Sequence, residues 1–243
     1  MSKIKIKQYN VPIRALPLEF AGYRIMQITD IHLGKGFHVE SIFELAAKVK
    51  VDMVALTGDI IHRKYALHQV RPFLTKLLDS LKPTDGFFGV LGNHDKWITD
   101  NELKDLPIRW LYNEAVQLKR AGETINLIGL DQQSWVATDI LSAMQNIISD
   151  KPVIVLAHYP STAYLLSGVI DLVIAGHTHS GQIKIPGFPF RTNDDISWRH
   201  GGGVSKIGGT KLVVSAGLGF SGPFPFRIFT PSEITVIELT SAS

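Results

Sequence analysis

The residues best suited to chemistry are aspartates, histidines and one asparagine that follow short apolar runs of the sequence. Five such runs, each about the length of a strand, lie at 23–29, 51–57, 87–91, 153–157 and 172–175. The polar side chains that follow them are Asp30, His32, Asp59, Asn93, His94, Asp95, His158, His177 and His179. In open α/β sheets, ligands bind at the carboxyl ends of the strands. We therefore expect these side chains to meet at one edge of a sheet.

The spacing within this set strengthens the interpretation. Asp30 and His32 are two residues apart, and so are His177 and His179. Side chains at this spacing point the same way in an extended segment, so both members of a pair are expected to reach one centre. Taken singly, a residue such as His158 could be a hydrogen-bonded core histidine. Five of the nine histidines fall at strand ends, however, and this joint pattern favours a functional site.

The chemistry that needs this set is metal chemistry. Four histidines, two aspartates and one asparagine oxygen exceed the requirements of one tetrahedral ion and suit two divalent ions that share a carboxylate. Imidazole and carboxylate ligands favour Mn, Fe, Zn, Co or Ni over Ca or Mg, and Mn is the ion we favour. A pair of ions about 3.5–4 Å apart can activate water and stabilise both oxygens of an in-line displacement at phosphorus.

The overall composition narrows the class of protein. The chain has 243 residues, of which 45% are apolar and 19% charged, and this composition excludes wholesale disorder. The net charge of +3 gives no support for a nucleic-acid partner. There is no cysteine, so disulfides, thiolate metal sites and a catalytic thiol are excluded. We see no apolar run long enough for a membrane span or a signal peptide, and expect a cytoplasmic protein.

The two-residue alternation of lysine and isoleucine over 3–7 predicts an edge strand whose lysines discourage pairing with other chains. The alternative is a basic segment that, together with Arg14, contacts an anionic membrane surface peripherally.

The elements that must position the polar residues follow from hydrophobic periodicity. Apolar residues at helical spacing predict helices over 39–49 and 67–81, with Pro72 near the first turn of the second. With the first three apolar runs, these helices give a β-α-β-α-β order and hence a parallel sheet covered by helices. Further segments are predicted as short strands within 109–130, a helix over 138–148, and strands over 211–215, 226–230 and 233–239. We expect one mixed α/β domain over residues 1–243 with two packed sheets, because the strands outnumber one comfortable sheet.

Taken in order, these residues resemble the signature of the calcineurin-like metallophosphoesterases, which reads D-x-H, G-D, G-N-H-D, a lone histidine and G-H-x-H. The matching blocks are Asp30-Ile31-His32, Gly58-Asp59, Gly92-Asn93-His94-Asp95, His158 and Gly176-His177-Thr178-His179. All five blocks are present in order and span residues 30–179. The resemblance implies an α/β fold, a four-layer αββα sandwich of two mixed β-sheets flanked by helices.

The resemblance also implies roles for individual residues. The ligands implied for the first ion are Asp30, His32, Asp59 and His179. The ligands implied for the second are Asp59, Asn93, His158 and His177, so Asp59 would bridge the two ions. His94 would be no ligand; it would donate a proton to the leaving oxygen or steady the phosphate, with Asp95 orienting and charging it.

A narrower resemblance covers the last third of the chain. The segments 176–183, 215–219 and 231–235 are similar to a bacterial branch that includes the YkuE-type phosphohydrolases and a UDP-2,3-diacylglucosamine hydrolase. Two positions depart from the pattern of this branch. Ser180 replaces the first glycine after the histidine pair, and Ala216 stands where many members carry an arginine.

Candidate substrate-binding residues lie next to these motifs. His62 and Arg63 follow Asp59 closely and could reach the substrate phosphate, or could belong to a solvated loop. Arg191 and His200 lie in a polar segment without periodicity, which indicates a lid or recognition loop. Phenylalanines and prolines cluster over 188–190 and 220–226. They predict either core packing or an apolar wall for an acyl chain, and the second idea fails if these rings are buried away from the metals.

The function predicted from the sequence is that of a metal-dependent phosphoesterase, a hydrolase of phosphoric ester or phosphoanhydride bonds. A hydroxide that bridges the two metals would attack phosphorus in line. The substrate would be a small-molecule or lipid-linked phosphodiester or pyrophosphate, such as a UDP-diacylglucosamine-like compound or another nucleotide. The alternatives are a phosphomonoesterase acting on a small metabolite and a non-catalytic metal-binding scaffold of the same fold.

Overall fold

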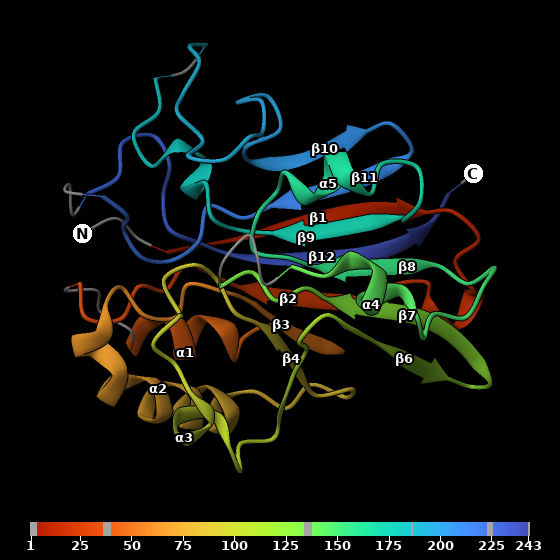
Figure 1. The fold of residues 1–243 in the computed structure, drawn as a ribbon, viewed down its shortest axis with the longest axis horizontal. Helices are drawn as coiled ribbons and strands as arrows, with labels where there is room; N and C mark the ends of the chain where they lie inside the picture. The colour runs from red at the N-terminus through yellow and green to blue at the C-terminus, as the bar shows by residue number, and fades with distance from the viewer. Residues whose placement is uncertain (1–3, 36–39, 134–137, 186, 223–225, 243) are drawn as a thin grey trace.

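The computed structural model describes residues 4–35, 40–133, 138–185, 187–222 and 226–242. Two six-stranded mixed β-sheets make up most of the fold (Figure 1). The strands of the first sheet, in spatial order, are β1 (Lys5–Ile13), β12 (Glu233–Ser241), β2 (Arg24–Ile28), β3 (Met53–Thr57), β4 (Phe87–Val90) and β5 (Ile108–Trp110). Those of the second are β10 (Gly203–Ile207), β11 (Thr210–Val214), β9 (Leu172–Ala175), β8 (Val153–Leu156), β7 (Glu123–Gly129) and β6 (Glu114–Arg120).

The helices cover the outer faces of the two sheets. The first sheet carries α1 (Glu40–Ala46), α2 (Leu67–Ser80) and α3 (Asp100–Leu103), which share one apolar cluster with it. The second carries α4 (Ile140–Met144) and α5 (Thr162–Leu165). Short 3₁₀ turns are η1 (Leu18–Phe20), η2 (Lys64–Ala66) and η4 (His179–Gly181). The expected four-layer αββα sandwich is therefore confirmed.

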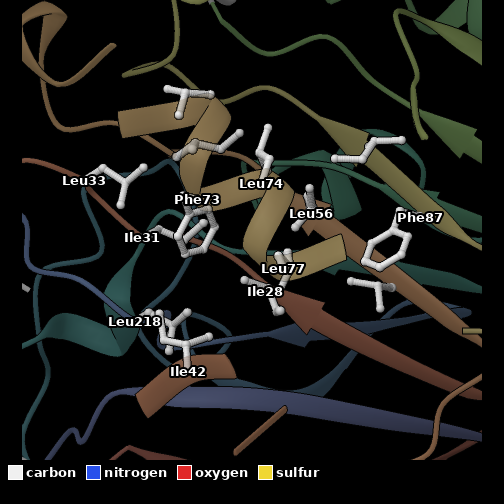
Figure 2. Packing of buried hydrophobic residues seen from close by; sticks show 14 of the residues in the cluster. Ile28, Ile31, Leu33, Ile42, Leu56, Phe73, Leu74, Leu77, Phe87 and Leu218 are labelled. Carbon is white, nitrogen blue, oxygen red and sulfur yellow. The ribbon is translucent and has the colours of Figure 1, made fainter. Parts of the chain in front are cut away.

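The apolar pattern of the central strands explains why both faces of each sheet are covered. In β3, Val54 and Leu56 belong to the cluster beneath the helices, whereas Met53 and Ala55 belong to the cluster between the sheets. Figure 2 shows Leu56 among the side chains contributed by α2. Because successive residues of a strand face opposite sides, an uninterrupted apolar run is what a strand buried on both faces requires. Burying one such side chain stabilises the fold by roughly 1.5–3 kcal/mol.

Most predicted elements are present, with differences in their bounds. Strand β1 runs from Lys5 to Ile13 and not over 3–7, and helix α1 ends at Ala46 rather than 49. Helix α4 ends at Met144 rather than 148, because the backbone N–H of Ile148 donates to the side chain of Asn126 (2.8 Å). The strand expected over 226–230 is reduced to one isolated bridge. Pro72 is the sixth residue of α2 and so lies in its second turn. Strand β10 was not predicted, since its residues were expected to follow a polar loop.

Strand β1 lies at the edge of the first sheet, as its alternating lysines predicted. Its neighbour is β12, with which it pairs in parallel. Lys7 forms an ion pair with the buried Glu233 (2.5 Å). This lysine therefore serves the packing of the sheet, which favours the edge-strand interpretation over a free basic segment. Within the described residues, no helix combines the length and the apolar character that crossing a bilayer requires.

Candidate active site

The polar residues selected from the sequence converge at one edge of the sandwich, where loops from both sheets meet. The loops after β2, β3 and β4 come from the first sheet, and those after β8 and β9 come from the second. Among the described residues, three groups have ligand atoms within 4.8 Å of one another. They are Asp30–His32–His179, Asp59–His158–His177 and His32–His62–His94.

The first group is fully buried. The Nε2 atoms of His32 and His179 lie 3.0 Å apart, and Nε2 of His179 lies 3.4 Å from Oδ1 of Asp30. The Asp30 carboxylate is held from behind, because its oxygens accept hydrogen bonds from the Thr29 hydroxyl (2.8 Å) and from the backbone N–H of His177 (3.0 and 3.1 Å). Three ligand-type atoms therefore face one small volume.

The second group gathers around His158. Its Nε2 lies 3.0 Å from Oδ1 of Asn93, 3.1 Å from Nδ1 of His177 and 3.4 Å from Oδ1 of Asp59. The other ring nitrogen donates to the carbonyl of Thr57 (3.0 Å), which fixes the orientation of the ring. His158 is thus fully buried, yet it is oriented toward other ligand-type atoms rather than packed as an ordinary core histidine.

Asp59 joins the two groups. Its Oδ2 lies 3.6 Å from Nε2 of His32, and its Oδ1 lies 3.4 Å from Nε2 of His158. Oδ1 also accepts the backbone N–H of His94 (2.9 Å). Burial by itself would raise the pKa of Asp59, but the neighbouring histidines, His158 first, hold that pKa well below its usual value. Asp59 is therefore a buried carboxylate that reaches both groups with different oxygens.

The backbone that carries these ligands differs from the sequence expectation. Asp30 and His32 have φ of 49° and 50°, and His177 and His179 have φ of 67° and 51°. They lie in left-handed turns and not in extended segments, so the two histidines of the second pair diverge into different groups. Such a conformation costs about 1–2 kcal/mol for a residue with a side chain. A non-glycine residue in this region is often part of a functional site.

Two glycines make the close approach possible. A Cβ atom on Gly92 would lie only 2.5 Å from Oδ1 of Asp59, and one on Gly176 would collide with the Asp30 carboxylate. Both glycines have ordinary φ values, so steric room and not backbone conformation explains why glycine is needed here.

The electrostatics of the site suit metal ligands. Burial lowers the pKa of His32 to about 3 and that of His177 to about 4, so both imidazoles are neutral and have a lone pair to donate. The Nδ1 of His32 is buried and has no hydrogen-bond partner among the described residues. Burial also holds the pKa of His179 well below its usual value, whereas Asp59 raises the pKa of His158 to about 10 against the effect of burial, so His158 must lose a proton to bind a metal. Imidazole nitrogens that face one another, with buried carboxylates between them, form a donor set that fits two divalent transition-metal ions.

The two residues expected to handle protons, His94 and Asp95, form hydrogen bonds with different partners. Nδ1 of His94 hydrogen-bonds to the carbonyl of His62 (2.8 Å), and the His94 ring lies 4.8 Å from the ring of His32. Asp95 does not orient the His94 ring as the resemblance implied. Its carboxylate accepts three backbone N–H groups, those of Ile60, Ile61 and Gly92 (2.8–3.1 Å). Asp95 therefore ties the β3 and β4 loops together, while burial raises its pKa to about 7.

The candidate substrate residues divide into three places. His62 and Arg63 line a cavity of about 510 Å³ beside His94. Arg191 lines a separate cavity of about 410 Å³ together with Tyr159 and Asn193. The backbone N–H of His200 donates to the carbonyl of Ser197 (2.8 Å), away from the candidate metal ligands. Its Nδ1 is buried and has no hydrogen-bond partner among the described residues.

Arg227 is a residue of the site that sequence reasoning missed. Its side chain donates to the carbonyls of Ala216 (2.8 Å) and Gly219 (2.6–3.0 Å), and its Nη2 lies 3.0 Å from Nδ1 of His179. Burial lowers the pKa of Arg227 to about 10, so the guanidinium stays charged. It supplies a cation beside the segment in which Ala216 replaces the arginine of related sequences. An arginine between phenylalanines in an otherwise apolar segment was the available signal.

Gln132 is a second such residue. Its side-chain oxygen accepts the backbone N–H groups of His158 (2.6 Å) and Tyr159 (2.7 Å), and it is fully buried. It sets the course of the loop that presents His158. A buried glutamine after a strand carries no recognisable motif, so the sequence could not have identified it.

Adding Mn²⁺ to metal-free protein is expected to raise the melting temperature, because the metals bind the folded state alone. At a free Mn²⁺ concentration of about 100 times the dissociation constant, one bound ion raises the free energy of unfolding by roughly 2.7 kcal/mol. For a chain of this size that corresponds to roughly 5–10 °C. Differential scanning calorimetry measures the shift. His32→Ala should reduce it, and an equal shift in that variant would contradict the assignment of His32 as a ligand.

Comparisons with known proteins agree with this geometry. The family model described as calcineurin-like phosphoesterase matches residues 23–181. An uncharacterized metallophosphoesterase of Campylobacter jejuni is 35% identical, over 97% of this chain and 63% of that protein. The chain thus spans somewhat less than two thirds of this relative. The uncharacterized metallophosphoesterase YkuE of Bacillus subtilis is 27% identical, over 99% of this chain and 87% of its own length.

Among solved structures, a dimetal phosphatase from Danio rerio superposes with a TM-score of 0.50 at 12% identity. The match covers 81% of this chain and 88% of that structure, and it supports the fold alone. The family match extends from just before β2 to η4 and so includes every loop that carries a ligand-type residue. The chain therefore belongs to the calcineurin-like phosphoesterase family.

Proposed function

We propose that the protein is a dinuclear-metal-dependent phosphohydrolase whose substrate is a phosphodiester or a pyrophosphate-linked compound. The observation that supports it best is the position of Asp59, whose two oxygens face His32 (3.6 Å) and His158 (3.4 Å) in the two ligand groups. A single carboxylate between two such groups suits a pair of ions a few ångströms apart. Mn²⁺ is the ion to test first.

In this proposal the first ion is held by one buried group and the second by the other. The ligands of the first are Asp30, His32, Asp59 and His179, and those of the second are Asp59, Asn93, His158 and His177. When bound, the ions would supply an activated water molecule and positive charge for the phosphate. The side chains around the ions would exclude bulk water, since five of the seven proposed ligands are buried and the other two, Asn93 and His177, are half-buried.

His94 is proposed as the proton donor to the leaving oxygen. Since a carbonyl oxygen only accepts hydrogen bonds, Nδ1 of His94 must carry a proton where it meets the His62 carbonyl (2.8 Å). A second proton on Nε2 can then pass to the oxygen that departs from phosphorus. In this arrangement the His94 ring is oriented by the backbone carbonyl of His62, in the loop after β3, and not by a carboxylate.

The cavity beside His94 is suited to bind a leaving group that carries a negative charge of its own. It is lined by Arg63, Lys64 and Lys96, and the two lysine ammonium groups each lie 5.3 Å from the centre of the Trp97 ring. Cation–π contacts with the same ring hold the two charges near each other. Among the described residues, no carboxylate forms an ion pair with any of these three cations. A pyrophosphate-linked substrate, whose leaving group bears its own phosphate, fits this charge.

Removing both charges in Lys64→Ala/Lys96→Ala is expected to reduce kcat/KM for diadenosine diphosphate on the order of tenfold or more. The rate with bis(p-nitrophenyl) phosphate, whose leaving group is uncharged until it departs, should change little. Lys48→Ala/Lys50→Ala removes the same charge before β3, at the opposite edge of the sheet, and serves as the control. An equal loss on both substrates would contradict a role in recognising the leaving group.

The experiment that tests the proposed function is hydrolysis by Mn²⁺-loaded protein of three probes. They are an aryl phosphodiester, an aryl phosphomonoester and a UDP-linked acylated sugar. Asp59→Asn protein is the blank. Turnover of the diester or the UDP-sugar above the blank supports the proposal. Preference for the monoester would replace it with a small-metabolite phosphatase. No turnover on any probe at full metal occupancy would favour the non-catalytic scaffold.

We also propose that residues 1–243 act as one domain. The cluster between the two sheets draws side chains from both, among them Ile25 and Met53 from the first and Ile154 and Ile174 from the second. Neither sheet could bury its inner face alone. Limited proteolysis that released a stable half of the chain would contradict this proposal.

A further inference from the structure

Two segments beside the metal ligands form a short ribbon with two different faces. Ile183 and Ile228 pair as a parallel bridge. The backbone N–H of Lys184 donates to the carbonyl of Ile228, and the N–H of Ile228 donates to that of Gln182 (both 3.0 Å). This pairing fixes the two segments side by side, immediately after His179 and around Arg227.

The inner face of the ribbon belongs to the site. Arg227 turns inward, where it bonds the carbonyls of Ala216 and Gly219 and meets the His179 ring. Because neighbouring residues of an extended segment face opposite sides, the residue after Arg227 faces outward, and so does its bridge partner. That residue is Ile228, which is 41% exposed, and its partner Ile183 is 38% exposed.

Exposed apolar residues gather on these two segments and the turns that continue them. We call them the apolar rim; its members are Ile183, Ile185, Phe188, Phe226, Ile228 and Phe229. Ile185, Phe188 and Phe229 have 61%, 65% and 73% of their surface exposed. Single exposed apolar residues are ordinary, but several on adjoining segments mark a binding surface. Of the phenylalanines expected to form an apolar wall, Phe188 and Phe226 are exposed and Phe190 and Phe220 are half-buried, whereas Phe224 lies outside the described residues.

The charge around the rim restricts what can bind it. The segments 180–193 and 219–230 contain no aspartate or glutamate, although the chain has 22 acidic residues in all. Their cations include Lys184 and Arg191, and Lys35 donates a hydrogen bond to the carbonyl of Gly222. The two rim segments thus combine exposed isoleucine and phenylalanine with positive charge, and the nearest carboxylates in sequence are Asp194 and Asp195, just beyond the first segment.

We propose that the apolar rim docks the protein onto a lipid bilayer that contains anionic headgroups. Isoleucine and phenylalanine enter the boundary between headgroups and acyl chains, and the nearby cations attract anionic lipid. The segments without carboxylates match a surface of negative potential. Because Arg227 of the same ribbon contacts His179, docking would bring the metal site to the level of the headgroups. A phosphate ester carried by a lipid would meet the site there.

The proposal is tested by co-sedimentation with phosphatidylcholine vesicles, with and without phosphatidylglycerol. Wild-type protein is expected to bind the anionic vesicles and to be released as salt screens the charges. Phe188→Ser/Phe229→Ser should weaken binding on the order of tenfold or more, because two exposed rings no longer enter the bilayer. The control is Leu18→Ser/Leu141→Ser, which removes two leucines that are 81% and 82% exposed on η1 and α4.

The binding assay is independent of catalysis, so it separates this proposal from the proposed function. Unchanged melting temperatures establish that both double variants fold. Failure of the wild type to bind anionic vesicles at low salt overturns the proposal, as does equal loss in the control variant. If light scattering instead finds a dimer that Phe188→Ser/Phe229→Ser separates, the rim binds a second copy of the chain and the proposal is wrong.

Discussion

Asp59→Asn is expected to reduce turnover on the order of a thousandfold or more. The change removes the negative charge that faces both ligand groups, so each ion loses a ligand and the repulsion between the ions is no longer offset. A thousandfold loss corresponds to about 4 kcal/mol of transition-state stabilisation. Steady-state rates with Mn²⁺ and an aryl phosphodiester measure it, alongside the metal content of each protein.

The substitution is nearly isosteric, and the remaining amide oxygen can still accept the backbone N–H of His94. A general collapse of the fold is therefore not expected, and circular dichroism checks this. Asp79→Asn, at an exposed position of α2, is the matched control and should keep wild-type activity. Wild-type rates in Asp59→Asn at full metal occupancy would mean that Asp59 does not bridge the ions.

His94→Ala is expected to retain its metals and to lose roughly 10²–10⁴ of the rate, the range usual for a general acid. The loss should be greatest for substrates with poorly leaving alkoxides and smallest for p-nitrophenolate, which departs without a proton. Rates for a series of leaving groups, plotted against the leaving-group pKa, measure this dependence. His68→Ala changes an exposed histidine of α2 and is the control.

The competing interpretation is specific, because His94, His32 and His62 also form a group with ligand-type spacing. If His94 held a metal, His94→Ala would lose an ion, and all substrates would slow by the same factor. Metal content and the leaving-group series therefore distinguish a proton donor from a ligand. His62→Ala adds a second comparison. The backbone carbonyl that bonds His94 is retained in that variant, so the proton-donor model predicts a smaller loss of rate than in His94→Ala.

The sequence located the polar residues that converge at the sheet edge, and it could do so for a physical reason. A metal ligand must be Asp, His or Asn at this kind of site, and a strand buried on both faces must be apolar. The change from apolar run to polar residue therefore marks the sheet edge in the sequence itself. Val51 to Thr57 followed by Asp59 is an example, and Leu172 to Ala175 followed by His177 is another. Helices α1 and α2 could also be predicted from the sequence. Their apolar residues recur at helical spacing because one face of each helix packs on the first sheet.

The sequence was less informative where the backbone leaves regular structure. It predicted extended pairs at Asp30–His32 and His177–His179, whereas all four residues lie in left-handed turns. Aspartate and histidine adopt this conformation more often than most residues do, but that weak preference does not say at which positions. Hydrogen bonds from neighbouring loops decide it. Here the backbone N–H of Asp30 donates to the carbonyl of Gly58, and that of His32 donates to the carbonyl of Asp59 (both 3.0 Å).

The sequence by itself determined the types of polar side chain at the sheet edge, their order along the chain and the strands that carry them. Only the tertiary structure decided their partners: Asp95 ties two loops and leaves His94 to the carbonyl of His62, and Arg227 reaches His179 from 48 residues away. It alone also decided that Phe188, Phe226 and Phe229 are exposed. The physical reason is common to these cases. A side chain's type follows from the chemistry it can perform, but its neighbours are fixed by the packing of segments distant in sequence, which no local pattern records.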